Sequence, residues 1–446
     1  MNPYFRVAVV SLILSIAMCA TTLGAKKPKA PASTGVISVR DFGAKGDGKT
    51  DDTIAFRDAL NEAGKTGANV FVPAGNYVIK GNINIPPHTT IEGVFKAPTA
   101  RAKSVGTVLW AYADKGNENG TPFIFMNPES CIKGLNIFYP EQDKDKITPY
   151  PWTIRGMGDN ISIVDVNILN PWKAVDFGTH PCGRHYVKGL YGQPLNTGIV
   201  INHCLDVGRL TDIHFWPFWS DDPKVMEYTS KNATAFIFGR TDWELVSNAF
   251  CISYNIGFKF TSFGQDAPNV MFVNCGPDAG GEAAILVEAT QVHAGILFSN
   301  CQINGRIIIK PGSIGPVRFD NCNLYPYYPY PFYLPGSEKK IPFDEGYYIL
   351  NEGSNRLTLS NCQLYFPEPP FLVSDMPYTD TKMSAIYSNG AGLTISGSDF
   401  TAIPNNQVKL GPKSKSTIIF GNAVKKGLTV VNEGTGKPEV FGNLQE

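Results

Sequence analysis

Apolar residues along the chain come in short runs, and polar or turn-forming residues separate one run from the next. The runs hold three to five residues, are rich in β-branched and aromatic side chains, and recur about every 11 residues. Runs of this length fit strands and are too short for helices. The Gly, Asn, Asp and Pro residues between them are typical of tight turns. Representative runs are Ala284 to Val287, Ile296 to Phe298, Arg306 to Ile309 and Val317 to Phe319.

This spacing predicts an all-β solenoid, in which each coil of short strands stacks on the previous one. Parallel strands in an α/β protein need crossover connections of a dozen or more residues, usually helices. The sequence shows no such helical pattern alternating with the runs. A repeat of strands and turns without helices indicates coils that bury their apolar sides against one another.

A four-residue pattern that ends in Asn-Cys repeats in the second half of the chain. Stacked asparagine side chains hydrogen-bond along a ladder of coils, so we interpret these asparagines as structural. The cysteines occupy one repeated position and lack metal-ligand spacing such as CxxC, which favours buried free thiols over disulfides. The copies are Phe272-Val273-Asn274-Cys275, Phe298-Ser299-Asn300-Cys301, Phe319-Asp320-Asn321-Cys322 and Leu359-Ser360-Asn361-Cys362.

Two segments depart from the strand repeat. Residues 52–63 are expected to form an amphipathic helix, because Thr50, Asp51 and Asp52 supply capping side chains and Gly64 ends the apolar pattern. This short N-terminal helix would cover the first coil of the solenoid. Residues 325–348 are rich in Tyr, Pro and Phe, and we expect them to leave the solenoid as a loop. The rings of this loop either pack on one another or flank a sugar-binding subsite.

The first residues of the chain are expected to direct its export. Arg6 precedes an apolar run of twelve residues, Val7 to Met18, which suits a signal peptide and is shorter than the ~20 residues of a membrane span. Cleavage after Ala25 would remove residues 1–25 and leave residues 26–35 as a linker and 36–446 as one solenoid domain. Lipidation at Cys19 is the alternative. The expected location is secreted or periplasmic, without a further membrane span.

Composition narrows the range of partners. The chain has 39 Lys and Arg against 39 Asp and Glu, so bulk charge does not favour a nucleic acid as partner. Hydrophobic residues make up 43% and charged residues 17% of the chain, which excludes a disordered polyelectrolyte. The cysteines left after cleavage are even in number, so disulfides remain the alternative to free thiols in an oxidising compartment.

The segment Val39-Arg40-Asp41-Phe42-Gly43-Ala44-Lys45-Gly46-Asp47-Gly48-Lys49-Thr50-Asp51-Asp52-Thr53, followed by Val70-Phe71-Val72-Pro73-Ala74-Gly75-Asn76-Tyr77, resembles the start of the pectate-lyase-like superfamily. That superfamily includes glycoside hydrolase family 28 and its relatives, family 55 glucanases and phage tailspikes. The resemblance implies a right-handed parallel β-helix and a protein that acts on or binds long carbohydrates. Only fragments echo the active-site motifs of family 28, so no catalytic role is carried over. These fragments are Asp221-Asp222, His293-Ala294-Gly295 and Arg306 to Lys310.

We expect the chemistry to lie between Asp176 and Glu244, where histidines, tryptophans and carboxylates are concentrated. Four of the six histidines and three of the six tryptophans fall in these 69 residues. Aromatic faces stack on sugar rings, while Arg, His and carboxylate groups hydrogen-bond the hydroxyls. The candidate catalytic residues are Asp206, Asp212, Asp242 and Glu244, and the candidate substrate-binding residues are Arg184, His185, His214, Trp216, Trp219, Arg240 and Trp243.

The carboxylates are expected to act in pairs. If the strand period of two residues holds, Asp242 and Glu244 share a face with α-carbons about 6 to 7 Å apart, and Asp212 shares a face with His214. Glycoside hydrolysis needs two carboxyl groups roughly 5 to 9.5 Å apart. The leading prediction is an exported glycoside hydrolase, whose acids come from one strand or from two neighbouring coils and gather with the tryptophans in one trough.

Two other functions fit the same residues. In a polysaccharide lyase, Arg184, His185 or Arg209 would remove a proton beside a uronate carboxylate. In a non-catalytic binding protein, the solenoid would only display aromatic subsites to a polysaccharide. We expect a polysaccharide partner, a monomer or homotrimer, and no cofactor. The spacing of the acidic residues requires no metal.

Overall fold

The computed structural model describes residues 35–99, 104–264, 266–278, 281–325, 346–365, 384–401 and 405–445. The predicted signal peptide at 1–25 and residues 26–34 of the predicted linker lie outside the described residues, as do residues 326–345 of the predicted loop at 325–348. Residues 35–446 group together as one unit. The description below concerns the described part of this unit.

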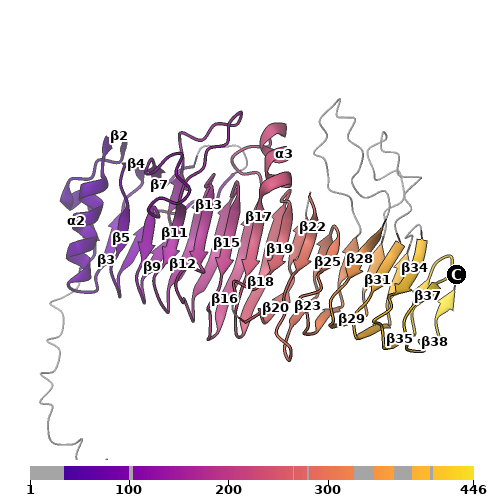
Figure 1. Ribbon diagram of the computed structural model, residues 1–446. Coiled ribbons are helices and arrows are strands. Elements are labelled where there is room, and N and C mark those ends of the chain that lie inside the picture. The colour runs from indigo at the N-terminus through magenta and orange to yellow at the C-terminus, as the bar shows by residue number, and fades with distance from the viewer. Residues whose placement is uncertain are drawn as a thin grey trace, which may run out of the picture. The chain divides into compact units, whose positions relative to one another are not determined.

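Two parallel sheets run along the unit and form the walls of a right-handed parallel β-helix, which confirms the predicted fold (Figure 1). Each coil gives one strand to a 13-stranded sheet, counted over the described residues. The strands of this sheet are β5 (Ile83–Ile85), β8 (Ile124–Met126), β11 (Trp152–Gly156), β13 (Lys173–Phe177), β15 (Thr197–Ile201), β17 (Thr234–Phe238), β19 (Ile256–Phe260), β22 (Ala283–Val287), β25 (Ile307–Ile309), β28 (Tyr347–Asn351), β31 (Ser384–Ser388), β34 (Asn405–Leu410) and β37 (Thr429–Asn432).

The other wall is a 26-stranded sheet among the described residues, in which most coils contribute two strands or one long bent strand. Its strands are β1 (Ile37–Ser38), β2 (Asp47–Asp51), β3 (Asn69–Val72), β4 (Gly75–Ile79), β6 (Thr90–Gly93), β7 (Thr107–Ala111), β9 (Cys131–Lys133), β10 (Asn136–Phe138), β12 (Ser162–Ile168), β14 (Tyr186–Gly192), β16 (Gly208–Phe215), β18 (Glu244–Ile252), β20 (Val270–Val273), β21 (Gly276–Asp278), β23 (Ile296–Ser299), β24 (Gln302–Asn304), β26 (Val317–Asp320), β27 (Asn323–Tyr325), β29 (Arg356–Ser360), β30 (Gln363–Tyr365), β32 (Gly392–Ser396), β33 (Asp399–Thr401), β35 (Ser416–Phe420), β36 (Ala423–Val424), β38 (Glu439–Phe441) and β39 (Leu444–Gln445).

A column of residues with left-handed backbone bends the 26-stranded sheet at the same place in successive coils. The residues of this bend column have φ between +51° and +70°. Such angles favour Gly, Asn and Asp over other residues. Side-chain bonds link neighbours in the column, for example Asn321 Nδ2 to Asn300 Oδ1 at 2.6 Å. The column consists of Gly134, Asp165, Gly189, Asp212, Asn248, Asn274, Asn300, Asn321, Asn361, Gly397, Gly421 and Gly442.

The interior of the solenoid is filled by stacked apolar side chains. Phe298 is fully buried, and its ring centroid lies 4.5 Å from that of Phe272 and 5.1 Å from that of Phe319. The eight cysteines of the described residues are free thiols, and seven of them are buried. Cys275 N donates to Cys301 Sγ at 3.4 Å, so thiols of neighbouring coils lie against each other. This arrangement agrees with the interpretation of the Asn-Cys repeat.

Two α-helices interrupt the strand pattern of the described residues. Helix α2 (Thr53–Gly64) lies over the first coils, as predicted, and buries Phe56, Ala59 and Leu60 (Figure 1). Asp51, the residue before the N-cap, accepts from Thr53 N at 3.0 Å, whereas the side chain of the N-cap residue Asp52 makes no capping bond. A short 3-10 helix, η1 (Val39–Phe42), precedes it.

Helix α3 (Pro223–Asn232) projects from the strands and was not predicted by the apolar pattern (Figure 1). Asp222 caps its first turn by accepting from Lys224 N at 3.0 Å, and Pro223 occupies the first helical position. This cap and this proline are a helix-start signal in the sequence.

Candidate functional site

The structure separates the predicted site residues into four places. The turns that follow five neighbouring strands of the 13-stranded sheet stack into one edge, which we call the turn edge. These turns are residues 178–185 after β13, 202–207 after β15, 239–243 after β17, 261–264 with 266–269 after β19, and 288–295 after β22. Arg184, Asp206, Arg240, Asp242 and Trp243 lie on the turn edge. His185 and Glu244 lie in the interior, Asp212 lies in the bend column, and His214, Trp216 and Trp219 lie at the far ends of the coils.

Arg184 links two carboxylates on the turn edge. Its guanidinium donates to Asp159 Oδ2 and to Asp206 Oδ2, both at 2.9 Å, and to Asn160 Oδ1 at 2.9 Å. The hydrogen bond from Arg184 lowers the pKa of Asp206, and the same bond raises the pKa of Arg184. An arginine engaged in this way is a poor proton acceptor, so Arg184 is unsuited to the base role considered for a lyase.

Arg240 holds Asp242 on the same edge. Both terminal nitrogens of Arg240 donate to the two carboxylate oxygens of Asp242, the Nη2–Oδ2 distance being 2.9 Å. Gln291 Nε2 also donates to Asp242 Oδ1 at 2.9 Å. These bonds, with that from Arg240 the strongest, lower the pKa of Asp242. Asp242 is therefore a fixed, ionised carboxylate whose side chain keeps 34% of its surface exposed.

A pocket of about 300 Å³ opens at Trp243, the residue after Asp242; Asp242 itself is not among its lining residues. The indole of Trp243 lines it and is 62% exposed. His293 and Arg318 also line it, and the charge of His293 adds to the effect of Arg240 in lowering the pKa of Asp242. An exposed indole beside a carboxylate, an imidazole and a guanidinium has the groups that bind sugar rings and their hydroxyls.

Sequence reasoning missed His293 and Arg318 as members of this pocket. His293 was noted only as part of a fragmentary His-Ala-Gly motif, and Arg318 lies in β26, more than 70 residues beyond Trp243. Strand pairing brings the segments together, because β23 pairs with both β20 and β26. The repeat of Asn-Cys units would have given this register.

The predicted shared face of Asp242 and Glu244 is wrong. Trp243 between them has φ of +59°, so the chain turns and the strand period of two does not apply. Asp242 points to the turn edge, whereas Glu244 is fully buried and its Oε1 lies 3.0 Å from His185 Nε2. His185 is also fully buried, which removes it from substrate contact and from the base role in a lyase.

The predicted pairing of Asp212 with His214 is also wrong. Asp212 has φ of +56° and belongs to the bend column, where its Oδ1 accepts from Asn248 Nδ2 at 2.9 Å. His214 follows the bend and packs among aromatic rings, including those of Phe218 at 5.2 Å and Phe250 at 5.3 Å. Burial lowers the pKa of His214.

Trp216 and Trp219 do not join Trp243. They precede α3 and the start of β17, whereas Trp243 follows the end of β17, so a strand of five residues, about 13 Å, separates the two groups. Gln193 Oε1 accepts from Trp219 N at 3.0 Å and anchors this loop. The expected single trough of acids and indoles is therefore not formed.

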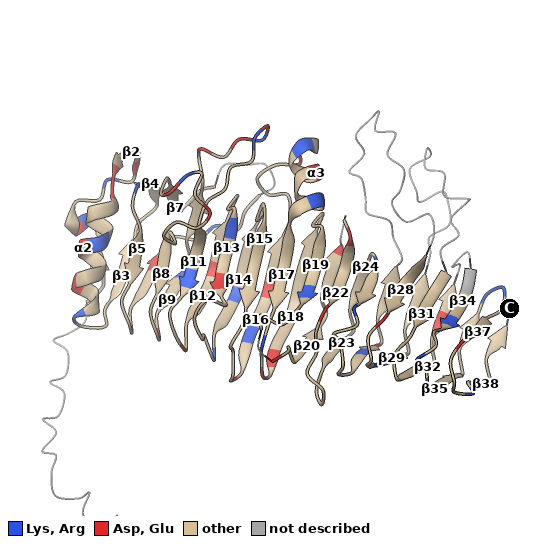
Figure 2. Cartoon of the chain, viewed as in Figure 1, with Lys and Arg blue, Asp and Glu red and all other residues tan. Residues whose placement is uncertain are grey.

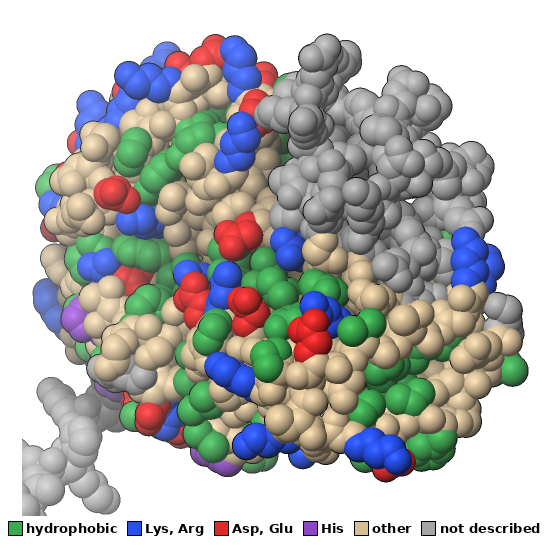
Figure 3. Space-filling model, turned by 45° about the vertical axis from the view of Figure 1, so that its right-hand side comes forward, with side chains coloured by type: hydrophobic (Ala, Val, Ile, Leu, Met, Phe, Trp, Pro, Cys, Tyr) green, Lys and Arg blue, Asp and Glu red, His purple; other side chains and the backbone are tan. Residues whose placement is uncertain are grey.

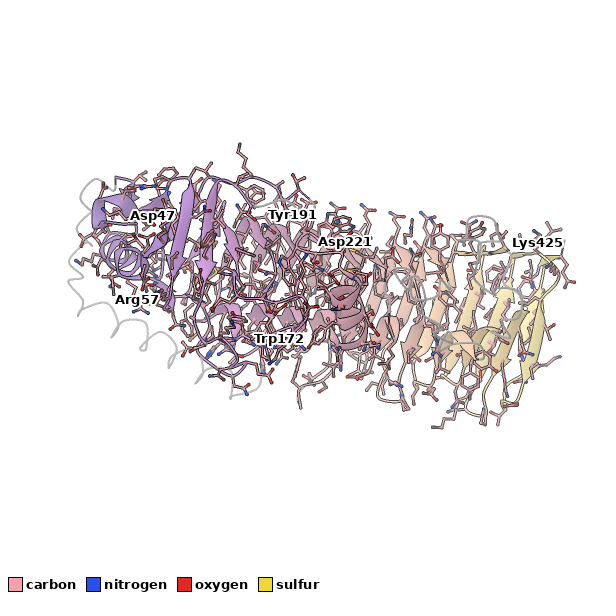
Figure 4. All side chains as sticks on the ribbon, turned by 90° about the horizontal axis from the view of Figure 1, so that it is seen from above. Asp47, Arg57, Trp172, Tyr191, Asp221 and Lys425 are labelled. Carbon is pink, nitrogen blue, oxygen red and sulfur yellow. The ribbon has the colours of Figure 1, made fainter. Side chains whose placement is uncertain are left out.

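Aromatic residues lie on opposite sides of the unit. Tyr191 lies near His214, with ring centroids 6.3 Å apart, and Trp172 packs near Tyr228 of α3, with centroids 6.1 Å apart. Figure 4, seen from above, shows Tyr191 and Trp172 on opposite sides of the strands. The aromatic group around His214 is thus remote from the 13-stranded sheet.

A second charged group that the sequence did not reveal lies on the outer face of the 13-stranded sheet. Arg155 Nε in β11 donates to Asp176 Oδ2 in β13 at 2.6 Å, and Lys173 Nζ lies 3.0 Å from Glu118 Oε2. Basic and acidic residues lie side by side on these strands (Figure 2). Figure 3 likewise shows a mixed group of acidic and basic side chains on the face it presents, without a patch of one sign.

Asp278 has a different environment from the other carboxylates. It ends β21 and pairs in register with Asn304 of β24. Burial raises its pKa to about 6, while Asn304 opposes the shift. Asp278 lies in the 26-stranded sheet and not on the turn edge.

Comparison with known proteins identifies relatives of this fold. The family described as "Rhamnogalacturonase A/epimerase, pectate lyase-like" matches residues 36–257. An exopolygalacturonase of Arabidopsis thaliana is 38% identical over 205 residues, which cover 40% of this chain and 46% of the relative. The tail spike protein of Shigella phage Sf6 is 38% identical over 284 residues, which cover 60% of this chain and 42% of the relative.

Among solved structures, the N-terminal fragment of gene product 12 of bacteriophage Phi29 superposes with a TM-score of 0.59 and 14% identity. The superposition covers 98% of this chain and 73% of the fragment, and it supports the fold alone. The chain spans less than half the length of the curated relatives it matches. Within the described residues, neither helix is long and apolar enough to cross a membrane.

Proposed function

Because the chain belongs to the pectate-lyase-like superfamily of parallel β-helix proteins, we propose that it acts on a polysaccharide and binds it along the turn edge. The proposal includes export, as the apolar run ahead of Ala25 predicts. Polysaccharides are too large to enter most cells, so an enzyme that acts on them works outside. Whether the protein is a monomer or a homotrimer stays a prediction.

The observation that carries this proposal is the pocket lined by Trp243, His293 and Arg318 beside Asp242. The indole of Trp243 is 62% exposed, and a sugar ring stacks well on such a face. Arg240 and Gln291 hold Asp242, which directly precedes Trp243 in the chain. A polar group fixed in this way suits orientation of a ligand.

Hydrolysis is the reaction that we propose for this pocket. Cleavage of a glycosidic bond needs a proton donor for the leaving oxygen and a base or nucleophile on the other side of the bond. The imidazole of His293, which lines the pocket, and the carboxylate of Asp242, which precedes Trp243, would supply one group of each kind. Asp206 is a further carboxylate on the neighbouring turn, because Cys204 pairs with Thr241. In this proposal the pair Asp242 and His293 replaces the pair Asp242 and Glu244.

A non-catalytic sugar-binding function is the second candidate. It is favoured by the way that the carboxylates of the turn edge are used, since Arg184 binds Asp206 and Arg240 binds Asp242. Carboxylates neutralised by arginines form a firm polar surface and leave fewer groups free for proton transfer. In this case the polysaccharide would bind at Trp243 and remain intact.

A panel of polysaccharides separates these functions. Purified mature protein is incubated with each polymer, and binding, new reducing ends and ultraviolet absorbance from unsaturated ends are measured. New reducing ends without ultraviolet absorbance support hydrolysis, unsaturated ends support a lyase, and binding without new ends supports the second candidate. Neither binding nor product formation with any neutral or uronate polymer would contradict the proposal.

Variants test whether the pocket is the site. Trp243→Ala should weaken binding at least tenfold, because loss of one ring stack removes about 1.4 kcal/mol or more. Asp242→Asn and His293→Gln should abolish product formation and leave binding measurable. Trp216→Ala and His88→Gln serve as controls, since both residues lie away from the turn edge. Full activity in the pocket variants, together with loss of activity in Trp216→Ala, would instead place the site at the ends of the coils near Trp216.

A further inference from the structure

Three side chains from consecutive coils meet inside the solenoid, beneath the turn edge. They are His185, Cys204 and Glu244, which lie in or directly after the turns that follow β13, β15 and β17. All three are 0% exposed. One donor atom from each, a ring nitrogen, the thiol sulfur and a carboxylate oxygen, lies within 4.8 Å of the other two. A nitrogen, a sulfur and an oxygen donor this close together are a set of atoms that one cation can share.

The hydrogen bonds of His185 define what that partner must be. His185 Nδ1 lies 2.9 Å from the carbonyl oxygen of Cys182, which only accepts, so Nδ1 carries a hydrogen. The other ring nitrogen, Nε2, faces Glu244 Oε1 at 3.0 Å. In a neutral imidazole this arrangement sets the lone pair of Nε2 against a carboxylate oxygen. A cation between the two atoms, either a proton or a metal ion, resolves the conflict.

Glu244 supplies an independent sign that a proton alone is insufficient. Its second oxygen, Oε2, is buried and has no hydrogen-bond partner among the residues that the structure describes. A buried carboxylate oxygen without a partner is costly, whereas a metal ion satisfies it. Gly208 leaves the space beside this oxygen open, because a Cβ there would lie 2.1 Å from Glu244 Oε2 and 2.4 Å from His185 Cε1.

We propose that His185 Nε2, Cys204 Sγ and Glu244 bind a divalent transition metal, with Zn²⁺ as the best match. Imidazole, thiolate and carboxylate are the ligands that Zn²⁺ takes in proteins, while Ca²⁺ and Mg²⁺ prefer oxygen ligands only. The bond from Nδ1 to the Cys182 carbonyl is the outer contact that orients a metal-binding histidine. This site replaces the expectation that the chain needs no metal.

Binding of the ion changes two hydrogen bonds of the metal-free chain, the one between His185 Nε2 and Glu244 Oε1 and the one made by the Cys204 thiol. The thiol of Cys204 donates to the carbonyl oxygen of Asp206 at 2.8 Å. A metal takes the thiolate and the lone pair of His185 Nε2, so the thiol proton and the proton between His185 and Glu244 both leave to solvent, and no oxidant or reductant is required. A water molecule or the freed Asp206 carbonyl completes the fourth position of the shell.

The metal would hold together the turns of the turn edge, which is the surface that we propose binds sugar. The metal proposal does not depend on that function. Each ligand lies within two residues of an exposed group of the turn edge: His185 follows Arg184, Cys204 precedes Asp206, and Glu244 follows Trp243. An ion shared by three coils therefore fixes the spacing of these three turns. Its role in this inference is structural.

Metal content of the untagged full chain tests the proposal. The protein is purified without chelator and its metals are measured by mass spectrometry; it is then unfolded with a chelator and refolded with Zn²⁺, with Co²⁺ or with no metal. We expect about one Zn²⁺ per chain and, with Co²⁺, the near-ultraviolet band of a cobalt–thiolate bond. The melting temperature should rise when metal is present during refolding.

Matched cysteine variants locate the ion. Cys204→Ala should lose the cobalt–thiolate band, whereas Cys251→Ala, which removes another fully buried thiol outside the cluster, should keep it. If Cys204→Ala fails to fold, the metal content of Glu244→Gln is compared with that of the wild type. The number of Zn²⁺ ions per wild-type chain still tests the proposal without any variant. Wild-type protein that retains no metal and gives the Co²⁺ spectrum of the free ion would overturn the proposal and leave an imidazolium–glutamate pair.

Discussion

Asp278 should make the stability of the protein fall as the pH rises from about 4 to about 7. Its pKa is raised from 3.8 to about 6 in the folded chain by burial. A group whose pKa is higher in the folded state holds its proton there, so its stabilising effect is complete below the unfolded pKa and is lost as the pH rises through the folded pKa. The side-chain hydrogen bond from Asn304, in register with Asp278, favours the ionised carboxylate and only partly offsets the effect of burial.

The size of the effect follows from the two pKa values. Their difference is about 2 units, and each unit corresponds to about 1.4 kcal/mol, so the upper limit is about 3 kcal/mol. Between about pH 4 and about pH 7.5 we expect a loss of about 2 kcal/mol, because the unfolded side chain is already partly ionised at the lower value.

Asp278→Asn tests this reasoning, because the amide stays neutral at both pH values. Guanidinium unfolding is followed at about pH 4 and about pH 7.5 for the wild type, for Asp278→Asn and for the exposed control Asp399→Asn. The difference in unfolding free energy between Asp278→Asn and the wild type should shift by about 2 kcal/mol in favour of the variant as the pH rises. An equal pH dependence in Asp278→Asn and the wild type would refute the assignment of a half-buried, protonated carboxyl.

Three further predictions concern the solenoid itself. Asn321→Ala should lower the unfolding free energy by about 2 kcal/mol, because it removes the 2.6 Å hydrogen bond to Asn300 and places Ala at φ of +51°. Asn321→Gly removes the same bond without the backbone strain and should cost about half as much. Equal losses in the two variants would argue against backbone strain at this position. Phe298→Ala should cost about 3 to 5 kcal/mol in the same unfolding assay, because it empties a fully buried site between two rings, and a loss below about 1 kcal/mol would contradict tight stacking. A thiol reagent should titrate all eight cysteines of the described residues in non-reducing denaturant, and a lower count would reveal disulfides.

The repeat and its turns were readable in the sequence because each has a local cause. Asn274 and its three copies fall at left-handed positions that Asn tolerates, so their spacing gave the stacking register directly. Helix α2 carries its start signal and its apolar stripe within twelve residues. Helix α3 was overlooked although Asp222 and Pro223 mark its start, since its apolar stripe is short.

The site was less predictable because it depends on where single residues bend the chain. Trp243 and Asp212 both take left-handed angles, and each reverses the side on which the following residues lie. Tryptophan rarely adopts such an angle, so nothing in the sequence around Trp243 indicated the turn that buries Glu244. The pocket also needs His293 and Arg318, which only the stacking of coils brings next to Trp243.

The bend column limits how far the amino-acid sequence can diverge while the chain keeps this fold. At seven positions it uses Asn or Asp and at five Gly, one in each successive coil. Other side chains raise the energy there, so tolerance to replacement should drop sharply once per coil and recover between. The spacing of these intolerant positions therefore measures the length of each coil. In a distant homologue with no residual identity, the intervals between such positions would still mark where every coil begins and how long its insertions are.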